Sequence, residues 1–389
     1  MKIALGLEYP IHQPGGTEVL VRELVYGLAD RHEILLVSDD SSTILRDPLV
    51  GGKIVGHLPW NATAVTFEKS RALVGALKAA EIDLAHFHFG GNYGWGNRLL
   101  NLCPVVHLAR LGVPCLATNH GVFGVFDGYI GPQRSALTKL ALLPAAWLSK
   151  MQTLSYLKTE IAVSQNDYRT LRRRYWPLRG KFRQIYHSRI HEHDRVAAVT
   201  RKKIVLCAGT VGQRKGQPYL AQAFARIAPE FPEWKLIFIG RPGELGTVEE
   251  LRRLLQDPPL RQQAEWLPAC SDDELKQWLQ AAEIFAMPSM HEGLGLSLQE
   301  ALFYGCACIA TRIGGIPDLI QHGSNGMLVE RANVNVLADG LAQLMRDEVL
   351  RKKLMARAQP SVIEKDMTAE RMVARHDALY REIAGTVSN

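Results

Sequence analysis

The 389-residue sequence contains six cysteines, yet no two of them form a C-x-x-C pair. Most of them lie within apolar runs, so we expect reduced core thiols of a cytoplasmic protein rather than disulfides. An apolar run of the roughly 20 residues that a membrane-spanning helix needs is also missing. The best candidate, residues 137–154, is interrupted by Lys139, Pro144 and Lys150. The chain is therefore not expected to cross a membrane.

Secretion signals, internal repeats and low-complexity segments are missing as well. The first residues, MKIALGL, have one lysine and a very short apolar run, which predicts a first strand rather than a signal peptide. What is present is an ordinary globular composition, with 47% hydrophobic and 22% charged residues. At this length we expect two domains.

The net charge of +7 is unevenly distributed. Residues 1–200 hold 23 Lys and Arg against 16 Asp and Glu, whereas residues 201–389 hold 23 of each sign. Much of the excess lies in residues 168–195, which carry nine basic and two acidic side chains together with Tyr and Trp. Such a segment suits a phosphate-rich surface, either nucleic acid or anionic lipid, although a solvated helix face explains it equally well.

Strand-like and helix-like segments alternate along the whole chain. Short apolar runs such as residues 2–7, 32–38 and 82–89 are separated by amphipathic stretches, and the rhythm restarts near residue 202. Buried apolar strands that alternate with helices indicate parallel sheets covered on both faces. The sequence therefore predicts an α/β fold with two doubly wound, Rossmann-like domains.

The domain limits follow from composition. We predict an amino-terminal domain over residues 1–190 and a carboxyl-terminal domain over residues 200–365, with the boundary in the polar stretch 187–200. Residues 366–389 carry apolar side chains at helical spacing and predict a final amphipathic helix. This helix is expected to pack back onto the first domain.

Two glutamates, Glu292 and Glu300, stand eight positions apart around a Gly-Leu-Gly turn that leads into a predicted helix. The backbone N–H groups from about Leu294 to Ser297 are first-turn donors that attract an anion such as a phosphate. Eight residues span at most roughly 12 Å along a helix, which suits a ligand with a diphosphate between two hydroxylated rings. Carboxylates accept hydrogen bonds from paired hydroxyls, so a nucleotide sugar fits this arrangement.

The segment HEGLGLSLQEA, followed by GCACIATRIGGIPDLI and GSNGMLVE, resembles the glutamate-x7-glutamate signature of the retaining GT-B glycosyltransferases of family 4. The resemblance covers nearly the whole second half of the chain and is looser over residues 1–200. It implies the GT-B fold, with two Rossmann-like domains facing across a cleft. It also implies that Glu292 contacts the donor sugar, that Glu300 holds the ribose, and that the turn binds the donor through Gly293, Leu294, Gly295 and Leu296.

In the first half, PGGTEVLVREL is similar to the family's first strand–helix loop, whose glycines lie against the donor phosphates. Gly15 and Gly16 match that role, and Thr17 is a candidate helix N-cap. The segment ATNHGVFG is similar to the strand that ends in a histidine near the donor sugar, here His120, although Val122 departs from the family's small residue. The stretch DLAHFHFGGNYGWGNR is a candidate for the acceptor side.

The loop LCAGTVGQRKGQPYL is similar to the family's diphosphate-neutralising loop, and Lys215 matches its lysine. Thr210 stands where the family commonly has an arginine, and the neighbouring Arg214 is the candidate for the second cation. By resemblance, His120, Glu292 and Lys215 are the catalytic residues. Thr210 and Arg214 are added to the glycine turns as donor-binding residues.

The implied reaction transfers a hexose from a UDP- or GDP-linked sugar to a hydroxyl group with retained configuration, and the leaving phosphate takes the acceptor's proton. No metal and no cofactor are expected. We expect a lipid-linked or polysaccharide acceptor, in the synthesis of lipopolysaccharide, capsule or exopolysaccharide. Two alternatives stay open, a GT-B nucleotide-sugar epimerase and a non-catalytic nucleotide-sugar-binding partner of another transferase.

The basic first half fits peripheral attachment of a cytoplasmic enzyme to the inner face of the cytoplasmic membrane. Residues 140–148, LALLPAAWL, are expected to add shallow insertion, although core packing explains them equally well. Nucleic acid is not an expected partner, because no recognition motif accompanies the arginine-rich segment.

Overall fold

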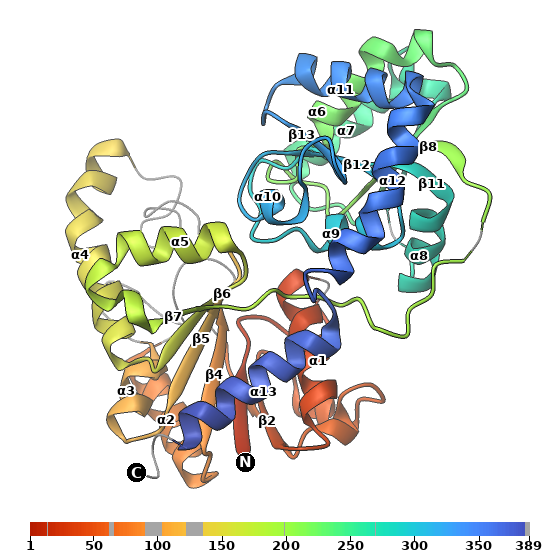
Figure 1. Cartoon of the computed structure of the whole chain (residues 1–389). Coiled ribbons are helices and arrows are strands. Elements are labelled where there is room, and N and C mark those ends of the chain that lie inside the picture. Colours follow the sequence, from red (N-terminus) through yellow and green to blue (C-terminus); the bar gives the residue numbers. More distant parts are fainter. Residues whose placement is uncertain are drawn as a thin grey trace. The chain divides into compact units, whose positions relative to one another are not determined.

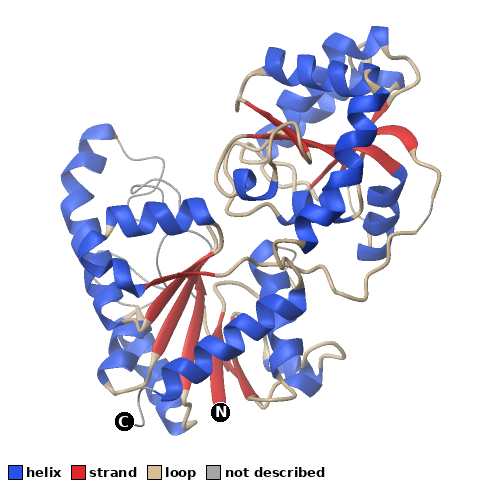
Figure 2. Ribbon diagram, in the orientation of Figure 1, coloured by secondary structure: helices blue, strands red, loops and turns tan. Residues whose placement is uncertain are grey.

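The computed structural model describes residues 1–13, 15–61, 66–89, 103–121, 135–197, 199–268 and 270–385. The chain folds into two compact units, shown in Figure 1 along the sequence and in Figure 2 by secondary structure. Unit 1 contains Met1–Arg189 and Thr368–Asn389, and unit 2 contains Ile190–Met367.

Unit 1 is built on a sheet of seven parallel strands within the described residues, in the order β3-β2-β1-β4-β5-β6-β7. The strands are β1 (Lys2–Gly6), β2 (Glu33–Ser38), β3 (Gly56–Pro59), β4 (Leu84–Phe89), β5 (Cys115–Asn119), β6 (Thr159–Ala162) and β7 (Phe182–Gln184). All their carboxyl ends therefore lie along one edge of the sheet.

The helices of unit 1 cover both faces of this sheet (Figure 1). They are α1 (Gly16–Leu28), α2 (Phe67–Ala79), α3 (Pro104–Arg110), α4 (Ala136–Tyr156), α5 (Gln165–Arg174) and α13 (Ala369–Gly385), with 3-10 helices η1 (Ser42–Arg46), η2 (Gly51–Lys53) and η3 (Trp176–Lys181). One face carries the apolar core that β4 shares with α2 to α5. The other face receives α1 and α13.

Alternation along β4 decides what each face receives. Ala85 and Phe87 point into the apolar core with α2 to α5. His86 points to the opposite face, where its ring contacts His376 and Tyr380 of α13. Successive side chains of a strand point to opposite faces, so one strand joins both layers.

Helix α13 is fixed in unit 1 by polar contacts as well as by packing. Asp377 accepts hydrogen bonds from His32 Nε2 at 2.7 Å and from Arg31 at 3.0 Å. Burial alone would raise the pKa of Asp377, but its bonds to His32, Arg381 and Arg31 lower that pKa to about 2. The carboxylate is therefore ionised at neutral pH and ties α13 to the end of α1.

Unit 2 repeats the parallel architecture, with six strands in the order β10-β9-β8-β11-β12-β13 among the residues that the structure covers. The strands are β8 (Lys202–Ala208), β9 (Lys235–Ile239), β10 (Ala264–Leu267), β11 (Ala282–Met287), β12 (Ala307–Thr311) and β13 (Gly326–Val329). The helices are α6 (Gln217–Ile227), α7 (Leu245–Gln256), α8 (Asp272–Ala281), α9 (Leu296–Phe303), α10 (Ile316–Leu319), α11 (Val334–Arg346) and α12 (Glu348–Ile363), with 3-10 helices η4 (Ala228–Glu230) and η5 (Leu260–Gln262).

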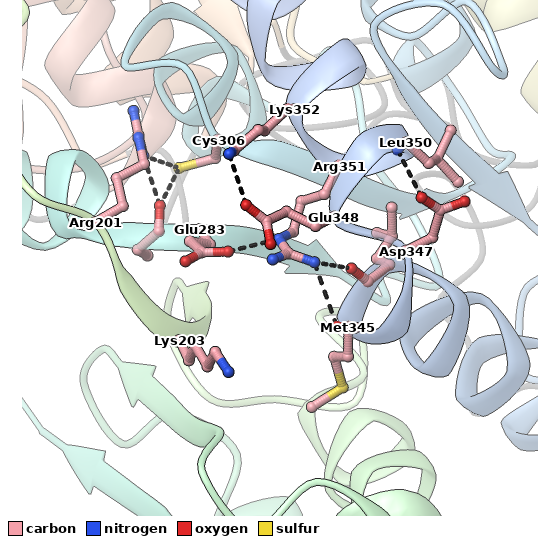
Figure 3. Close-up of polar contacts among 12 residues, drawn as sticks. Arg201, Lys203, Glu283, Cys306, Met345, Asp347, Glu348, Leu350, Arg351 and Lys352 are labelled. Carbon is pink, nitrogen blue, oxygen red and sulfur yellow. Dashed lines mark hydrogen bonds and ion pairs between the residues drawn. The ribbon is translucent and has the colours of Figure 1, made fainter.

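A buried arginine joins α11 and α12 to the sheet of unit 2 (Figure 3). Arg351 is 4% exposed and bonds the carboxylate of Glu283 on β11. It also donates to the carbonyl oxygens of Leu344, at 2.6 Å, and Met345, at the end of α11. These last-turn carbonyls have no intrahelical partner, so a cation there satisfies them and fixes the helix junction.

The sequence pattern missed β3 and β7, because strands of four and three residues are too short to show a periodicity. The predicted first strand and last helix are present as β1 and α13. Residues 137–154 fall within α4, and none of the helices in the described part of the chain has the length and apolar character needed to span a bilayer.

Candidate functional site

The loop between β8 and α6, residues 209–216, carries the predicted Lys215 and Arg214. Gln217, only 1% exposed at the start of α6, holds this loop from inside. Its amide nitrogen donates to the carbonyl oxygens of Gly209, at 3.3 Å, and Thr210, at 3.1 Å. The backbone conformation that presents the two cations is thus fixed by a buried side chain.

This loop lies directly against the segment that follows β11. Gly216 has φ +70°, and a Cβ there would overlap the carbonyl oxygen of Pro288. The N–H of Met290 donates to the carbonyl oxygen of Arg214 at 2.8 Å. A glycine is required at position 216 both for the left-handed backbone and for the close approach.

Lys215 and Glu292 form the centre of this arrangement. Lys215 Nζ donates to Glu292 Oε1 at 2.7 Å, and Ser289 Oγ donates to the same oxygen at 2.8 Å. Arg214 lies 3.6 Å from Glu292 Oε2, and the Glu292 side chain is only 6% exposed. Burial alone would raise the pKa of Glu292, but the charges of Lys215 and Arg214 and the hydrogen bonds lower it. The carboxylate is therefore ionised and held in place.

Glu292 leads through a glycine turn into α9. Gly295 is the N-cap, with φ +94°, and Gly293 accepts a hydrogen bond from the N–H of Gly315 at 2.8 Å. A Cβ on Gly314 would overlap the carbonyl oxygen of Glu292, so the Gly314–Gly315 pair supports the backbone of the turn. The N–H of Leu298 donates to the carbonyl oxygen of Gly295 at 3.1 Å. The N–H groups at the very start of a helix have no carbonyl one turn earlier, which leaves a partial positive charge at the start of α9.

The remaining predicted residues of unit 2 lie along the same segment. Leu294 is 4% exposed and Leu296 is partly buried, so a ligand role for them would involve their backbone. Glu300 lies in α9, about one turn beyond its start, and is 5% exposed. A buried acid on a short apolar helix is uncommon, because the charged form loses its hydration.

In unit 1, Gly15 and Gly16 lie where the chain enters α1. Gly15 is the N-cap and Gly16 is the first helical residue. The prediction of Thr17 as N-cap is wrong by two positions, because the helix begins earlier than the polar residue. A Cβ on Gly15 would overlap the carboxylate of Glu18, which reaches back over the helix start. The absence of a Cβ at Gly15 therefore leaves room for the Glu18 carboxylate at the helix start.

His120 follows β5 at the carboxyl edge of the sheet of unit 1. Its Nε2 lies 3.1 Å from Nδ1 of His88, the last-but-one residue of β4. Burial and the neighbouring His376 lower the pKa of His120 to about 3. The imidazole is therefore neutral at physiological pH. Val122 and residues 90–98 of the acceptor-side stretch lie outside the described residues.

The structure brings the predicted residues together in two groups. Lys215, Arg214 and Glu292 are in direct contact in unit 2, and the glycine turn continues from them into α9. Gly15–Gly16 and His120 lie at the carboxyl ends of β1 and β5, which are separated by β4 in the sheet of unit 1. Ligands of open α/β sheets bind at this edge.

Sequence reasoning missed two residues that shape the unit 2 site, Gln217 and Ser289. Gln217 stands directly before a proline at a helix start, and Ser289 stands three positions before Glu292. Neither is charged and neither belongs to a recognisable motif. For Ser289, the available signal was a polar residue just after an apolar strand.

The fold and this group of residues define an α/β protein with an anion-attracting helix start beside a buried carboxylate. Two family models match the chain. "Glycosyl transferases group 1" matches residues 188–360, and "Glycosyltransferase Family 4" matches residues 14–188. The chain belongs to the family 4, group 1 glycosyltransferases.

Individual relatives agree with this class. The N-acetyl-alpha-D-glucosaminyl L-malate synthase of Bacillus anthracis is 31% identical over 47% of this chain and 46% of its own length. The chain aligns with less than half of the length of the first curated relatives that it matches.

Two solved structures share the fold over nearly the whole chain. Sucrose-phosphate synthase from Thermosynechococcus elongatus superposes with a TM-score of 0.78 at 20% identity, covering 99% of this chain and 100% of that one. HepE from Anabaena, solved with UDP and glucose, gives 0.74 at 18% identity, covering 98% and 100%. The predicted GT-B fold is therefore confirmed.

Proposed function

We propose that this protein transfers a hexose from a nucleotide-diphosphate sugar to a hydroxyl group of an acceptor, with retained configuration. The observation that carries the proposal is the contact of Lys215 and Arg214 with the buried carboxylate of Glu292, directly before the start of α9. Two cations and a helix start attract a diphosphate, and the carboxylate accepts hydroxyl hydrogens of a sugar. HepE, which shares the fold, binds UDP, and a UDP-linked donor is the first candidate here.

Ligand binding would change the partners of Lys215. A diphosphate carries more negative charge than one carboxylate, so Lys215 and Arg214 are expected to turn toward it, since Arg214 is already 52% exposed. Glu292 would then accept from sugar hydroxyls in place of Lys215, with Ser289 holding one of its oxygens. Glu300, one turn further along α9, is the proposed acceptor for the ribose hydroxyls.

The difficult step is the departure of the nucleotide, during which negative charge grows on its phosphate. Lys215, Arg214 and the first-turn N–H groups of α9 would stabilise that charge where it develops. The leaving phosphate oxygen can take the proton of the acceptor hydroxyl, so the proposal needs no dedicated base. Gly15 and Gly16 are assigned to the donor phosphates and His120 to the donor sugar. Thr210 is proposed to bind the donor as part of the loop backbone that surrounds the phosphates.

A screen of UDP- and GDP-sugars for thermal stabilisation tests donor binding, because only ligands that bind the folded state raise the melting temperature. Transfer is then measured with the stabilising donor, and proton NMR of the first product gives its anomeric configuration. Inverted product would refute retention. Conversion of the donor sugar without any acceptor would favour an epimerase, and binding without turnover would favour a non-catalytic partner.

The acceptor class is proposed from the surface of unit 1. Leu137, Leu140 and Leu148 form one stripe on α4 and are 81%, 64% and 61% exposed. Trp176 of η3 is 69% exposed. Trp147 donates from its indole nitrogen to the last carbonyl of α5 at 3.3 Å, which places the stripe next to the arginine-rich end of α5.

Exposed leucines and a tryptophan beside Arg172, Arg173 and Arg179, all exposed, suit the headgroup region of an anionic membrane. We therefore place a lipid-linked acceptor for a surface glycan ahead of a soluble one. Sedimentation with vesicles tests this placement. Binding to phosphatidylglycerol but not to phosphatidylcholine, with release at high salt, is expected. Loss of binding in Trp176→Ser would support insertion of the apolar surface that Trp176 forms beside the stripe, whereas no binding at any salt concentration would end the membrane proposal. Equal retention on DNA would instead favour a nucleic-acid surface.

A further inference from the structure

Five histidines cluster beneath α13 in unit 1, and one of them, His187, has its ring centre 5.1 Å from that of His120 and 5.8 Å from that of His376. His86 and His88 lie on β4 with ring centroids 4.1 Å apart, and His120 follows β5. His376 comes from α13 and lies 5.6 Å from His86, ring centre to ring centre. His120 is the member to which the proposed function gives a role, so the hydrogen bonds of the other rings determine what His120 can offer a ligand.

His376 shows how the hydrogen is placed in this surrounding. Its Nδ1 lies 2.8 Å from the carbonyl oxygen of Met372, which can only accept, so Nδ1 carries the hydrogen. Its Nε2 is buried and has no hydrogen-bond partner among the residues that the structure describes. In neutral His376 the N–H is therefore hydrogen-bonded, and the nitrogen without a hydrogen is the one that has no such partner. This agrees with the rarity of orphaned buried N–H groups in proteins.

His88 has the same pattern. Its Nδ1 lies 3.1 Å from Nε2 of His120, and its own Nε2 is buried with no hydrogen-bond partner in the described part of the chain. If His120 donated to His88, the hydrogen of His88 would lie on that partnerless Nε2. If His88 donates, its bare nitrogen is the one without a partner, as in His376. The second arrangement leaves no buried donor unsatisfied at His88.

We propose that His88 is a positioning residue that donates from Nδ1 to Nε2 of His120 and so fixes the hydrogen of His120 on Nδ1. His120 then presents an N–H donor, and a hydroxyl oxygen of the donor sugar is its acceptor. The hydrogen placement stands on the geometry of unit 1 alone. The sugar contact rests on the proposed function.

The ring of His88 is held in the donating orientation by its neighbour on the strand. His86 is bound at both nitrogens, with Nδ1 2.6 Å from the hydroxyl of Tyr380 and Nε2 2.7 Å from that of Thr118. His86 thus forms a fixed surface against which the His88 ring packs, with an angle of 41° between the two ring planes. Burial lowers the pKa values of His88 and His120, so both rings stay neutral and each carries one ring hydrogen, which the hydrogen bonds place. The carboxyl-terminal helix, through Tyr380, therefore takes part in orienting His120.

The test is histidine NMR of the full chain labelled with 15N-histidine, near pH 7.5 and without ligand. Long-range 1H–15N spectra distinguish protonated from bare ring nitrogens, and loss of a signal in His120→Gln assigns that residue. We expect a bare Nε2 and a protonated Nδ1 in His120. A protonated Nε2 in the wild-type protein would overturn the proposal.

Two variants separate positioning from packing. His88→Leu removes the donor, whereas His88→Asn keeps an N–H in the place of Nδ1. We expect a mixture of His120 tautomers in His88→Leu, with kcat/KM lowered at least about ten-fold, and the wild-type tautomer with activity within about three-fold in His88→Asn. Melting temperatures within a few degrees exclude unfolding as the cause. A wild-type tautomer in His88→Leu would contradict the inference.

Failure of the hydrogen placement and failure of the proposed function can be told apart. The tautomer is read without substrate, so it holds or fails independently of turnover. If no nucleotide sugar is bound or turned over by the wild-type protein, the proposed function and the sugar contact fail, but the hydrogen placement stands on the spectra.

Discussion

Lys150 and Glu160 form an ion pair in the interior of unit 1, with side chains that are 2% and 0% exposed. Lys150 Nζ, on α4, lies 2.9 Å from each carboxylate oxygen of Glu160 on β6. Burial lowers the pKa of Lys150, to about 7, and raises that of Glu160, against their mutual attraction. Glu160 also accepts from Asn119, whose own side-chain oxygen accepts from the N–H of Gly121. The pair therefore supports the turn that carries His120.

Removing one partner of this pair should be costly. Lys150→Met leaves a buried carboxylate without its cation, and we expect the free energy of unfolding to fall by about 3–5 kcal/mol. The double variant Lys150→Met with Glu160→Leu should recover most of that loss, because no buried charge remains. Urea unfolding measures both. Lys352→Met, which breaks an exposed pair with Glu348, is the matched control and should leave the midpoint unchanged.

Loss of Lys215 should affect turnover more than folding. Lys215→Met removes the main charge that lowers the pKa of Glu292, together with the proposed stabilisation of the leaving phosphate. We expect kcat to fall about 100- to 1,000-fold, the range for removal of one such group. Initial rates with the donor found in the thermal screen measure this. Lys352→Met serves again as control, and a Lys215→Met enzyme with full kcat would refute the assignment.

Replacing two glycines that have positive φ angles should lower stability to different extents. Gly323→Ala meets only backbone strain, since φ is +76° and nothing lies within 4 Å of the new methyl group. It should cost about 1–2 kcal/mol. Gly216→Ala adds an overlap with the carbonyl oxygen of Pro288, so it should cost more and also weaken donor binding. Equal losses in the two variants, with unchanged donor affinity in Gly216→Ala, would show that the loop does not need its close contact.

The histidine group makes the stability of unit 1 sensitive to acid. The pKa values of His120 and His376 are lowered to about 3 and about 4, and those of His86, His88 and His187 lie well below 6.5, chiefly through burial. The unfolded chain binds protons at these sites below about pH 6.5 while the folded chain does not, so stability is lost as the pH falls from about 6.5 toward 4.

Each such histidine adds about 1.4 kcal/mol per pH unit to the slope within this window. Urea midpoints measured from pH 7.5 to 4.5 give the slope. His376→Phe keeps a ring in place and should reduce the slope by about one histidine's share. A slope unaltered by this variant would mean that the cluster does not take up protons on unfolding.

The sequence predicted the site best where a motif is local. Glu292, the glycine turn and Lys215 were found from short segments, because a turn followed by a helix start needs particular residue types at fixed spacing. The pattern gave no sign that Lys215 and Glu292 pair at 2.7 Å, since they lie 77 positions apart and meet only when the loops after β8 and β11 become neighbours. Gln217 and Ser289 were missed for the same reason.

The sequence pattern predicted less about the side-chain contacts of unit 1. His86 and His88 belong to the stretch predicted as a candidate for the acceptor side, and their alternation placed them on one face without showing what covers that face. Tyr380 and His376 approach them from a helix almost 300 positions later in the chain. The network of contacts that orients His120 could not be predicted from residues 114–121 alone.

The sequence by itself determined the alternation of strands and helices, the two parallel sheets and the local motifs, because hydrophobic periodicity and backbone constraints act over a few residues. Only the tertiary structure decided which charges pair, which histidines meet and which nitrogen of His120 is free. These depend on long-range packing, where a shift of one strand position would turn a side chain to the other face.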